Sequence, residues 1–145
     1  MKVLLDTNVL IRFFRDPLSL QSFETRARRP LVYLSSVVAL ELFAGCSTAR
    51  QVKALKRFLK PFEKAGRMIV PDYGCFAEAG RVLAALGGEG LSRDRRALLV
   101  NDALIAVSGA RSGCVVVTAN AVDFAAIARH SAVRWMPVNR RATKP

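Results

Sequence analysis

Residues 2–8 read Lys-Val-Leu-Leu-Asp-Thr-Asn, and this stretch decides the fold. The apolar run at 2–5 predicts a short strand, and the polar residues at 6–8 are the types that begin helices. Apolar residues then continue over 9–14 and predict a helix that ends before Asp16. The chain therefore opens with a strand that leads directly into a helix.

The same alternation continues along the chain. We expect further strands at 31–34, 68–70, 114–117 and 133–136. We expect further helices at 19–28, 37–45, 48–64, 72–86, 92–111 and 120–129, with a mobile connection at 87–90. Apolar strands that alternate with helices predict the α/β class, here an α/β/α sandwich around a central, mostly parallel sheet.

Size and composition fit one ordinary domain. The chain has 145 residues, of which 52% are hydrophobic, and a mean hydropathy of +0.23. We expect a single domain over residues 1–138 and a basic, frayed tail over 139–145. No apolar run is long enough to cross a membrane, and Asp6 interrupts what would be the core of a signal peptide. We therefore expect a cytoplasmic protein without a membrane partner.

Cysteine usage agrees with a reducing compartment. The three cysteines, Cys46, Cys75 and Cys114, are odd in number and form no CxxC pair. They are expected to be buried or half-buried residues, and not a zinc site or a disulfide framework.

The chain is strongly basic. It carries 23 Lys and Arg against 11 Asp and Glu, a formal net charge of +12. This surplus favours a polyanionic partner, either nucleic acid or an acidic protein segment, although some small proteins are simply basic. The basic clusters are Lys53, Lys56, Arg57 and Lys60 on one helix face, Arg93, Arg95 and Arg96 at a helix start, and Arg140, Arg141 and Lys144 in the tail. Each cluster either contacts a nucleic-acid backbone or is a solvated face.

Four of the few carboxylates lie in apolar or constrained surroundings: Asp6, Glu41, Asp102 and Asp123. Asp6 and Asp123 follow predicted strands. Asp6 could also be a helix N-cap, and Asp123 could also belong to a capping box in which Asn120, three residues earlier, is the N-cap. Glu41 lies on an apolar helix, either paired or on an exposed stripe. Asp102 interrupts a long helix that is apolar nearly all round, so it needs partners, and a backbone amide or an Arg could supply them.

Together these positions allow the four carboxylates to converge at one edge of the sheet. Crowded carboxylates repel one another and have raised pKa values, and a divalent cation relieves that repulsion. Oxygen ligands without a nearby His or Cys favour Mg²⁺ or Mn²⁺. The single histidine, His130, lies at a predicted helix end, where it is expected to interact with the helix dipole and not to act in catalysis.

Four segments resemble the signature segments of PIN-domain nucleases. They are LLDTNVLI at 4–11, ALELFAG at 39–45, NDALIAV at 101–107 and VVVTANAVDF at 115–124. They occur in order at family-like separations over residues 3–124. The opening and the chain length are most similar to the VapC-type toxins of type II toxin–antitoxin pairs.

The resemblance implies a metal-dependent endoribonuclease that uses Mg²⁺, with Mn²⁺ as a possible substitute. Asp6, Glu41, Asp102 and Asp123 match the acidic quartet that binds metal and carries catalysis, and Thr7, Thr118 and Asn120 match the polar residues around it. Asn120 stands where many PIN domains have a further aspartate. It keeps a helix-capping role but removes a charge, which would weaken a second metal site.

The resemblance also implies partners. VapC-like proteins form homodimers and are silenced by an antitoxin whose C-terminal segment covers the acidic site. Phe13, Phe14, Leu42 and Phe43 are candidate contacts for that segment, and the alternative for them is plain core. RNA would be held by Lys53, Lys56, Arg57, Lys60, Arg95 and Arg96.

The expected reaction is hydrolysis of an RNA phosphodiester by a metal-activated water, with one or two ions. Glu41 or Asp123 would orient or deprotonate that water. Two alternatives remain open: a housekeeping PIN nuclease that processes RNA without an antitoxin, and a catalytically silent PIN module that binds RNA. A phosphatase with Asp6 as nucleophile is disfavoured, because Asn8 stands where a second acid is expected.

Overall fold

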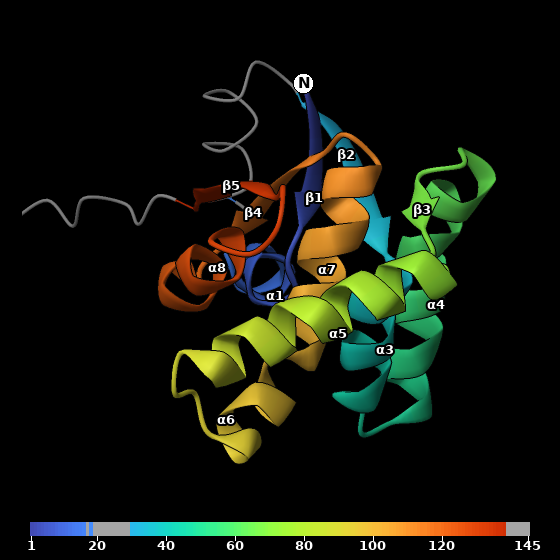
Figure 1. Ribbon diagram of the computed structural model, residues 1–145. Helices are drawn as coiled ribbons and strands as arrows, with labels where there is room; N and C mark the ends of the chain where they lie inside the picture. Colours follow the sequence, from blue (N-terminus) through green and yellow to red (C-terminus); the bar gives the residue numbers. More distant parts are fainter. Residues whose placement is uncertain (17, 19–29, 139–145) are drawn as a thin grey trace, which may run out of the picture.

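A five-stranded parallel sheet forms the centre of the computed structural model, which describes residues 1–16, 18 and 30–138 (Figure 1). The strands are β1 (Lys2–Leu5), β2 (Leu31–Ser35), β3 (Met68–Ile69), β4 (Val115–Thr118) and β5 (Arg134–Pro137). Their order across the sheet is β3-β2-β1-β4-β5, and every neighbouring pair is parallel. The predicted α/β class with a parallel sheet is confirmed.

Helices connect and cover these strands. They are α1 (Thr7–Arg15), α3 (Ser36–Ala44), α4 (Ala49–Lys64), α5 (Tyr73–Gly88), α6 (Arg93–Leu98), α7 (Val100–Arg111) and α8 (Ala121–Ala128). The predicted helix at 19–28 and the predicted tail at 139–145 lie outside the described residues. No helix in the described part of the chain is long and apolar enough to span a membrane.

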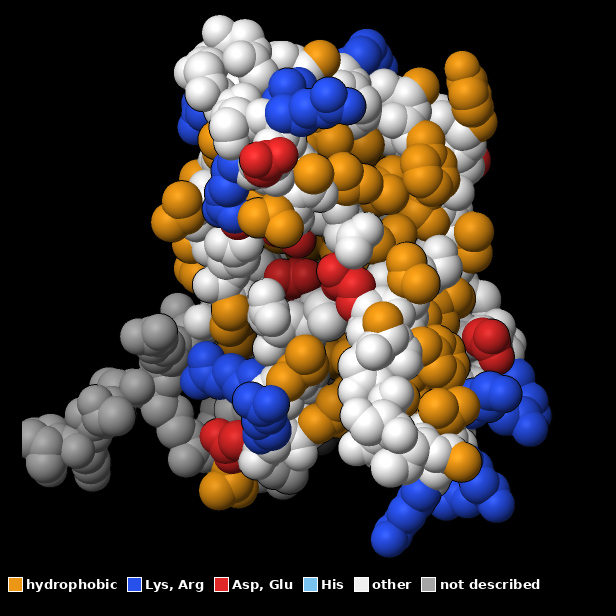
Figure 2. Space-filling view, turned by 90° about the horizontal axis from the view of Figure 1, so that it is seen from below, with side chains coloured by type: hydrophobic (Ala, Val, Ile, Leu, Met, Phe, Trp, Pro, Cys, Tyr) orange, Lys and Arg blue, Asp and Glu red, His pale blue; other side chains and the backbone are white. Residues whose placement is uncertain are grey.

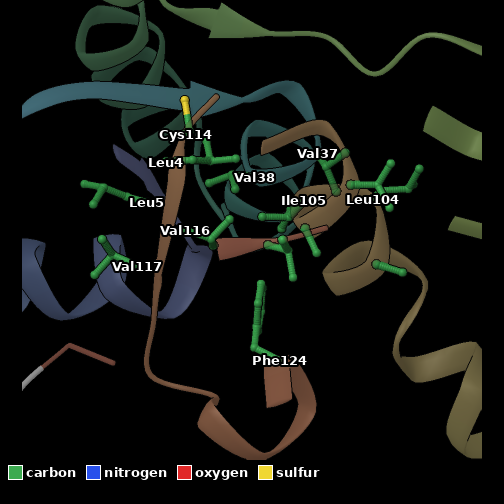
Figure 3. Packing of buried hydrophobic residues seen from close by; sticks show 14 of the residues in the cluster. Leu4, Leu5, Val37, Val38, Leu104, Ile105, Cys114, Val116, Val117 and Phe124 are labelled. Atoms are coloured by element: carbon green, nitrogen blue, oxygen red, sulfur yellow. The ribbon is translucent and has the colours of Figure 1, made fainter. Parts of the chain in front are cut away.

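Side chains of the two central strands alternate between the two faces of the sheet. Leu4 and Val116 point toward Ile105 of α7, whereas Leu5 and Val117 point to the opposite face, where α1 lies (Figure 3). This alternation follows from the two-residue period of a strand and explains why residues 3–5 of β1 and 115–117 of β4 are all apolar. Both faces of β1 and β4 are therefore core.

Helix α7 lies directly on the sheet because a glycine permits the approach. A Cβ built on Gly109 would lie 2.9 Å from Val116 Cγ2 and 3.1 Å from Leu4 Cδ2. Helix α5 crosses over α7 on the side away from the sheet (Figure 1). Residues 103–109 of α7 are all buried, as the nearly uniform apolar sequence predicts.

Two of the predicted helix boundaries differ from the structure by more than one residue. The helix predicted over 92–111 is two helices, because the backbone breaks at Leu99, which has φ −92° and ψ 0°. Leu99 is buried, so the break anchors a core side chain and lets α6 leave in another direction. The predicted connection at 87–90 is also shorter, since Gly87 and Gly88 form the last turn of α5.

The cysteines agree with the sequence analysis. Cys75 and Cys114 are buried, Cys46 is half-buried, and all three are free thiols.

Candidate active site

Asp6 and Thr118 lie side by side where β1 and β4 end. The strands pair with Leu5 opposite Val117, and the Asp6 backbone N–H donates to the Val117 carbonyl at 3.0 Å. The chain runs from β1 toward β2 and β3 on one side and places β4 and β5 on the other, so this gap is the point where strand order reverses. Such a point is where open α/β sheets place their sites.

Asp6 is almost fully buried, at 2% exposure, and both of its carboxylate oxygens accept hydrogen bonds. The Thr7 backbone N–H donates to Oδ1 at 2.7 Å, and the Thr118 hydroxyl donates to Oδ2 at 2.8 Å. Asp6 is therefore the N-cap of α1 and a site residue at once. The capping interpretation of Asp6 is confirmed, and its role in catalysis or metal binding stays a prediction.

Glu41 joins the site from α3. The Thr7 hydroxyl donates to Glu41 Oε2, and the Asn101 side-chain amide donates to Oε1 at 2.8 Å. Thr7 thus links two carboxylates, with its backbone on Asp6 and its hydroxyl on Glu41. Asn101 directly precedes Asp102 and was not among the predicted site residues, yet its side chain is a partner of Glu41.

Asp102 lies in the first turn of α7 and not in the middle of a long helix, because of the break at Leu99. A helix N-terminus carries partial positive charge, which favours a carboxylate there. The Asn120 side-chain amide donates to Asp102 Oδ2 at 3.2 Å and to Asp123 Oδ2 at 2.6 Å. One amide nitrogen therefore binds two carboxylates.

This geometry corrects the capping role expected of Asn120. Asn120 is the N-cap residue of α8 by position, yet its side chain makes no capping hydrogen bond there. Its amide is used by the two aspartates, while its backbone N–H donates to the Thr118 hydroxyl at 2.9 Å. Position and backbone fit a cap, but the side chain belongs to the acidic site.

Asp123, in the first turn of α8, also pairs with a basic residue from α6. Asp123 is 8% exposed, and Arg95 Nη2 lies 2.6 Å from its Oδ1. The other oxygen accepts from Asn120, so both oxygens of this carboxylate are engaged. Arg95 therefore lies in the acidic site itself.

The contacts form one connected network from α3 to α6. It runs from Glu41 through Thr7 to Asp6, then through Thr118 and Asn120 to Asp102 and Asp123, and ends at Arg95. Figure 2 views the molecule from the side onto which the carboxyl ends of the strands open, and acidic side chains gather there in a recess. The structure thus brings the four predicted carboxylates and the three predicted polar residues together.

The crowding of carboxylates changes their acidity. Burial, together with the negative charges of Asp6, Asp123 and Glu41, raises the pKa of Asp102 to about 7. Burial also raises the pKa of Asp6, opposed by its hydrogen bonds from Thr118 and Thr7. Groups pushed this far from their usual range are typical of functional sites.

The donor set fits a hard divalent cation. The ligands on offer are carboxylate oxygens, and no His or Cys is among the network partners, a composition that suits Mg²⁺ or Mn²⁺. Within the described residues, no three acidic, His or Cys side chains already form a metal-binding group, because each carboxylate is turned to a donor of the protein. A cation would replace some of these hydrogen bonds.

The sequence matches the PIN domain family over residues 3–130, nearly the whole chain. The chain belongs to the PIN domain family. No curated protein matches it significantly.

Several solved structures have the same fold and align with nearly the whole of this chain. VapBC2 from Rickettsia felis bound to a promoter DNA fragment has 20% identity and a TM-score of 0.66, with 94% of this chain and 98% of that chain covered. DNA-bound VapBC from Salmonella typhimurium has 21% identity and a TM-score of 0.68, covering 96% and 99%. FitAcB from Neisseria gonorrhoeae has 21% identity and a TM-score of 0.66, covering 94% and 97%. At these identities the likeness establishes the PIN fold.

The basic residues of the PIN domain occupy different settings. Lys53, Lys56, Arg57 and Lys60 are all exposed on α4, as the helical spacing predicts. Arg96 instead lies across the last turn of α5, where a Cβ on Gly87 would come within 2.8 Å of Arg96 Cζ. Arg95 and Arg96 are neighbours in sequence but point to different partners. Arg140, Arg141 and Lys144 lie outside the described residues.

An apolar pocket of about 420 Å³ lies beside the acidic recess, between α1, α3 and α4. Glu41 lines it together with apolar side chains that include Phe14, Leu42 and Phe58. Phe14 is 50% exposed and packs edge-on against Phe58 at 4.9 Å between ring centroids. Figure 2 shows hydrophobic side chains next to the recess.

The four apolar residues that were candidate antitoxin contacts fall into two groups, those that line the pocket and those that lie in or against the core. Phe14 and Leu42 line the pocket, whereas Phe13 is buried in the core and Phe43 packs against the core. For Phe13 the core alternative is therefore the correct one.

His130 lies away from the acidic network. Its Nε2 is 2.7 Å from Glu89 Oε1, and Arg129 pairs with the same carboxylate at 2.6 Å. His130 follows the end of α8 at Ala128 and so misses the last turn expected for it.

Proposed function

We propose that this PIN domain is a metal-dependent endoribonuclease that acts as the toxin of a toxin–antitoxin pair. The observation that carries the proposal is the connected network of Asp6, Glu41, Asp102 and Asp123 at the strand-reversal point. Four carboxylates in one partly buried site destabilise the fold unless a cation or a proton offsets their charge. The raised pKa of Asp102 is a consequence of this charge repulsion and burial.

Asp6, Asp102 and Asp123 would hold Mg²⁺ or Mn²⁺, and Thr118 and Asn120 would orient their oxygens. A bound divalent cation supplies positive charge for a phosphate oxygen and an activated water for phosphodiester hydrolysis. Glu41 is fixed by Thr7 and Asn101, which leaves its carboxylate positioned to accept a proton. The site offers no His, so a proton transfer within it falls to carboxylates.

RNA is proposed as the substrate because the chain carries a surplus of basic charge and exposes part of it on one helix face. The four exposed cations of α4, Lys53, Lys56, Arg57 and Lys60, would contact backbone phosphates. Such contacts add affinity and salt sensitivity but carry little sequence information.

The pocket beside Glu41 supports an antitoxin as partner. It is apolar and open at the surface through Phe14, and it borders the acidic recess, so one segment of a partner could fill the pocket and cover the recess. The similar solved structures of VapBC and FitAcB are consistent with this assignment. We further propose that the domain acts as a homodimer in the cytoplasm.

The deciding experiment compares RNA cleavage by the wild type and by Asp102→Asn. Each protein is assayed with Mg²⁺, with Mn²⁺ and with EDTA on a labelled RNA pool, after removal of any co-purified partner. We expect cleavage by the wild type with metal only, and at least a 100-fold loss in Asp102→Asn, the order of effect for removing a key catalytic charge.

Two outcomes would contradict the proposal. Equal cleavage by both proteins would assign the activity to a contaminant or to another site. RNA binding without cleavage by the partner-free wild type would identify a silent binding module instead. Expression without a partner tests the toxin role separately, because a housekeeping nuclease would leave growth unchanged.

A further inference from the structure

Arg95 forms an ion pair with one carboxylate of the acidic site, although it belongs to a helix on the surface. Helix α6 contains no buried residue, yet Arg95 Nη2 reaches Asp123 Oδ1 at 2.6 Å. The exposure of the two partners differs, with 44% for the Arg95 side chain and 12% for that of Asp123. Asp123 is therefore mostly buried, whereas the Arg95 side chain that contacts it remains partly in solvent.

Contacts at both ends fix the backbone of α6, while the Arg95 side chain remains half-exposed. The Ser92 hydroxyl accepts from the Arg95 backbone N–H at 3.2 Å, which caps the helix. Arg96 lies against Gly87 of α5, and Leu99 is buried at the other end. A side chain that starts from a fixed backbone but lies half in water can leave its partner without moving the helix.

The pairing conflicts with a cation at the same carboxylate. Asp123 Oδ2 already accepts from Asn120, so Arg95 engages the remaining oxygen. A guanidinium and a divalent cation on one carboxylate would repel each other at close range. When a binding-competent state is only partly populated, the apparent affinity falls by that fraction.

We propose that Arg95 is a tethered counter-cation of the acidic site. It neutralises Asp123 while the site is metal-free and must leave Asp123 before a divalent cation can bind that carboxylate. Arg95 thereby lowers the affinity of the site for the cation, and this rests on the metal site of the proposed function. The same step frees one guanidinium at the edge of the site.

Mn²⁺ binding to the purified protein tests this, with free Mn²⁺ followed by electron paramagnetic resonance. The variants are Arg95→Ala and, as a matched control, Arg93→Ala, which removes the same charge from the same helix at an exposed position with no ion pair among the described residues. We expect Arg95→Ala to bind Mn²⁺ about three- to tenfold more tightly than the wild type, the effect of removing one half-exposed competing pair. Arg93→Ala should stay within about twofold, since an exposed charge is screened by solvent and salt.

A second readout is thermal unfolding. Arg95→Ala should lose stability without metal and regain it with Mn²⁺, which also shows that the variant folds.

The two proposals fail in different ways. If the wild type binds Mn²⁺ and Asp102→Asn abolishes that binding, but Arg95→Ala binds equally or more weakly, the counter-cation role is overturned and the metal site stands. If the wild type shows no saturable Mn²⁺ binding that depends on Asp102, the metal site is overturned, and the role of Arg95 with it. If Arg93→Ala and Arg95→Ala gain the same affinity for Mn²⁺, the effect comes from the lower net charge alone. That result would overturn the specific role of the Arg95–Asp123 pair.

Discussion

The Thr118 hydroxyl donates to Asp6 Oδ2 at 2.8 Å, although the two residues are 112 positions apart in sequence. They meet because β1 and β4 are neighbouring parallel strands and both end at the same edge. The same hydroxyl accepts from the Asn120 backbone N–H at 2.9 Å. Thr118 therefore holds the strand ends and the two halves of the carboxylate network together.

Thr118→Val should destabilise the protein, because it leaves Asp6 Oδ2, which is buried, and the Asn120 backbone N–H, which is half-buried, without their hydrogen-bond partner. We expect a loss of about 1–3 kcal/mol in the free energy of unfolding, the usual cost of an unsatisfied buried polar group. Urea denaturation measures it. Thr118→Ser keeps the hydroxyl and should retain most of the stability, so equal losses in Val and Ser would assign the effect to the methyl group.

Stability of the metal-free protein should fall as the pH rises from about 4 to 7. The folded pKa of Asp102 is about 7 and its ordinary value is 3.8, so between these values the folded state holds a proton that the unfolded state has lost. The folded state binds more protons in this window, and stability declines with pH until Asp102 is ionised in both states. Asp6, with a raised pKa, acts in the same direction.

Thermal melts of the wild type and Asp102→Asn at pH 5 and pH 8 isolate this effect. The wild type should lose several degrees more than Asp102→Asn between the two pH values, since one kcal/mol is worth about 3 °C for a chain of this size. Mg²⁺ should restore the wild type at pH 8. A melting temperature with the same pH dependence in both proteins would refute the raised pKa of Asp102.

Gly109→Ala should destabilise the fold, because its Cβ would meet Val116 Cγ2 at 2.9 Å and Leu4 Cδ2 at 3.1 Å. Overpacking of this kind costs about 1–3 kcal/mol. Gly80→Ala is the matched control, since Gly80 is exposed on α5 and a Cβ there meets nothing within 4 Å. That variant should gain up to about 1 kcal/mol from helix propensity. Denaturant midpoints of the two variants should therefore move in opposite directions.

Arg57→Gln should weaken RNA binding and reduce its salt dependence. If Arg57 contacts one phosphate, the slope of log affinity against log salt should shrink by about 0.7 for single-stranded RNA. The measurement uses the Asp102→Asn background, so that the RNA is not cut. Arg81→Gln, an equally exposed arginine on α5, serves as control. An equal change in slope for both would mean that α4 provides no specific binding face.

Local patterns predicted the elements of the fold well. The apolar runs and helix-starting residues were sufficient for the strands, for α4 with its Thr48 cap and for α5 with its Asp72 cap. The helix break at Leu99 was not predictable, because 92–111 has no Pro and Gly appears only near its end. Leu99 is held by core packing, which is a property of the assembled helices.

The sequence also singled out the four carboxylates that the structure brings together. Carboxylates in apolar surroundings are costly, so Asp6, Glu41, Asp102 and Asp123 stood out before any contact was known. The hydrogen-bond and ion-pair partners of these carboxylates could not be predicted from the sequence. The contact of Asn101 with Glu41 depends on how α7 lies against α3, and the contact of Arg95 with Asp123 depends on how α6 lies relative to α8. No spacing in the sequence contains these arrangements.

The sequence by itself determined which segments are strands and helices and which acidic side chains need a partner, because hydrophobic periodicity, capping residues and burial of charge act over a few neighbouring residues. Only the tertiary structure decided that Asn120 serves two aspartates and that Arg95 stands at Asp123. Strand order and helix packing bring residues together over long separations, and side-chain hydrogen bonds form with whatever donor then lies within about 3 Å.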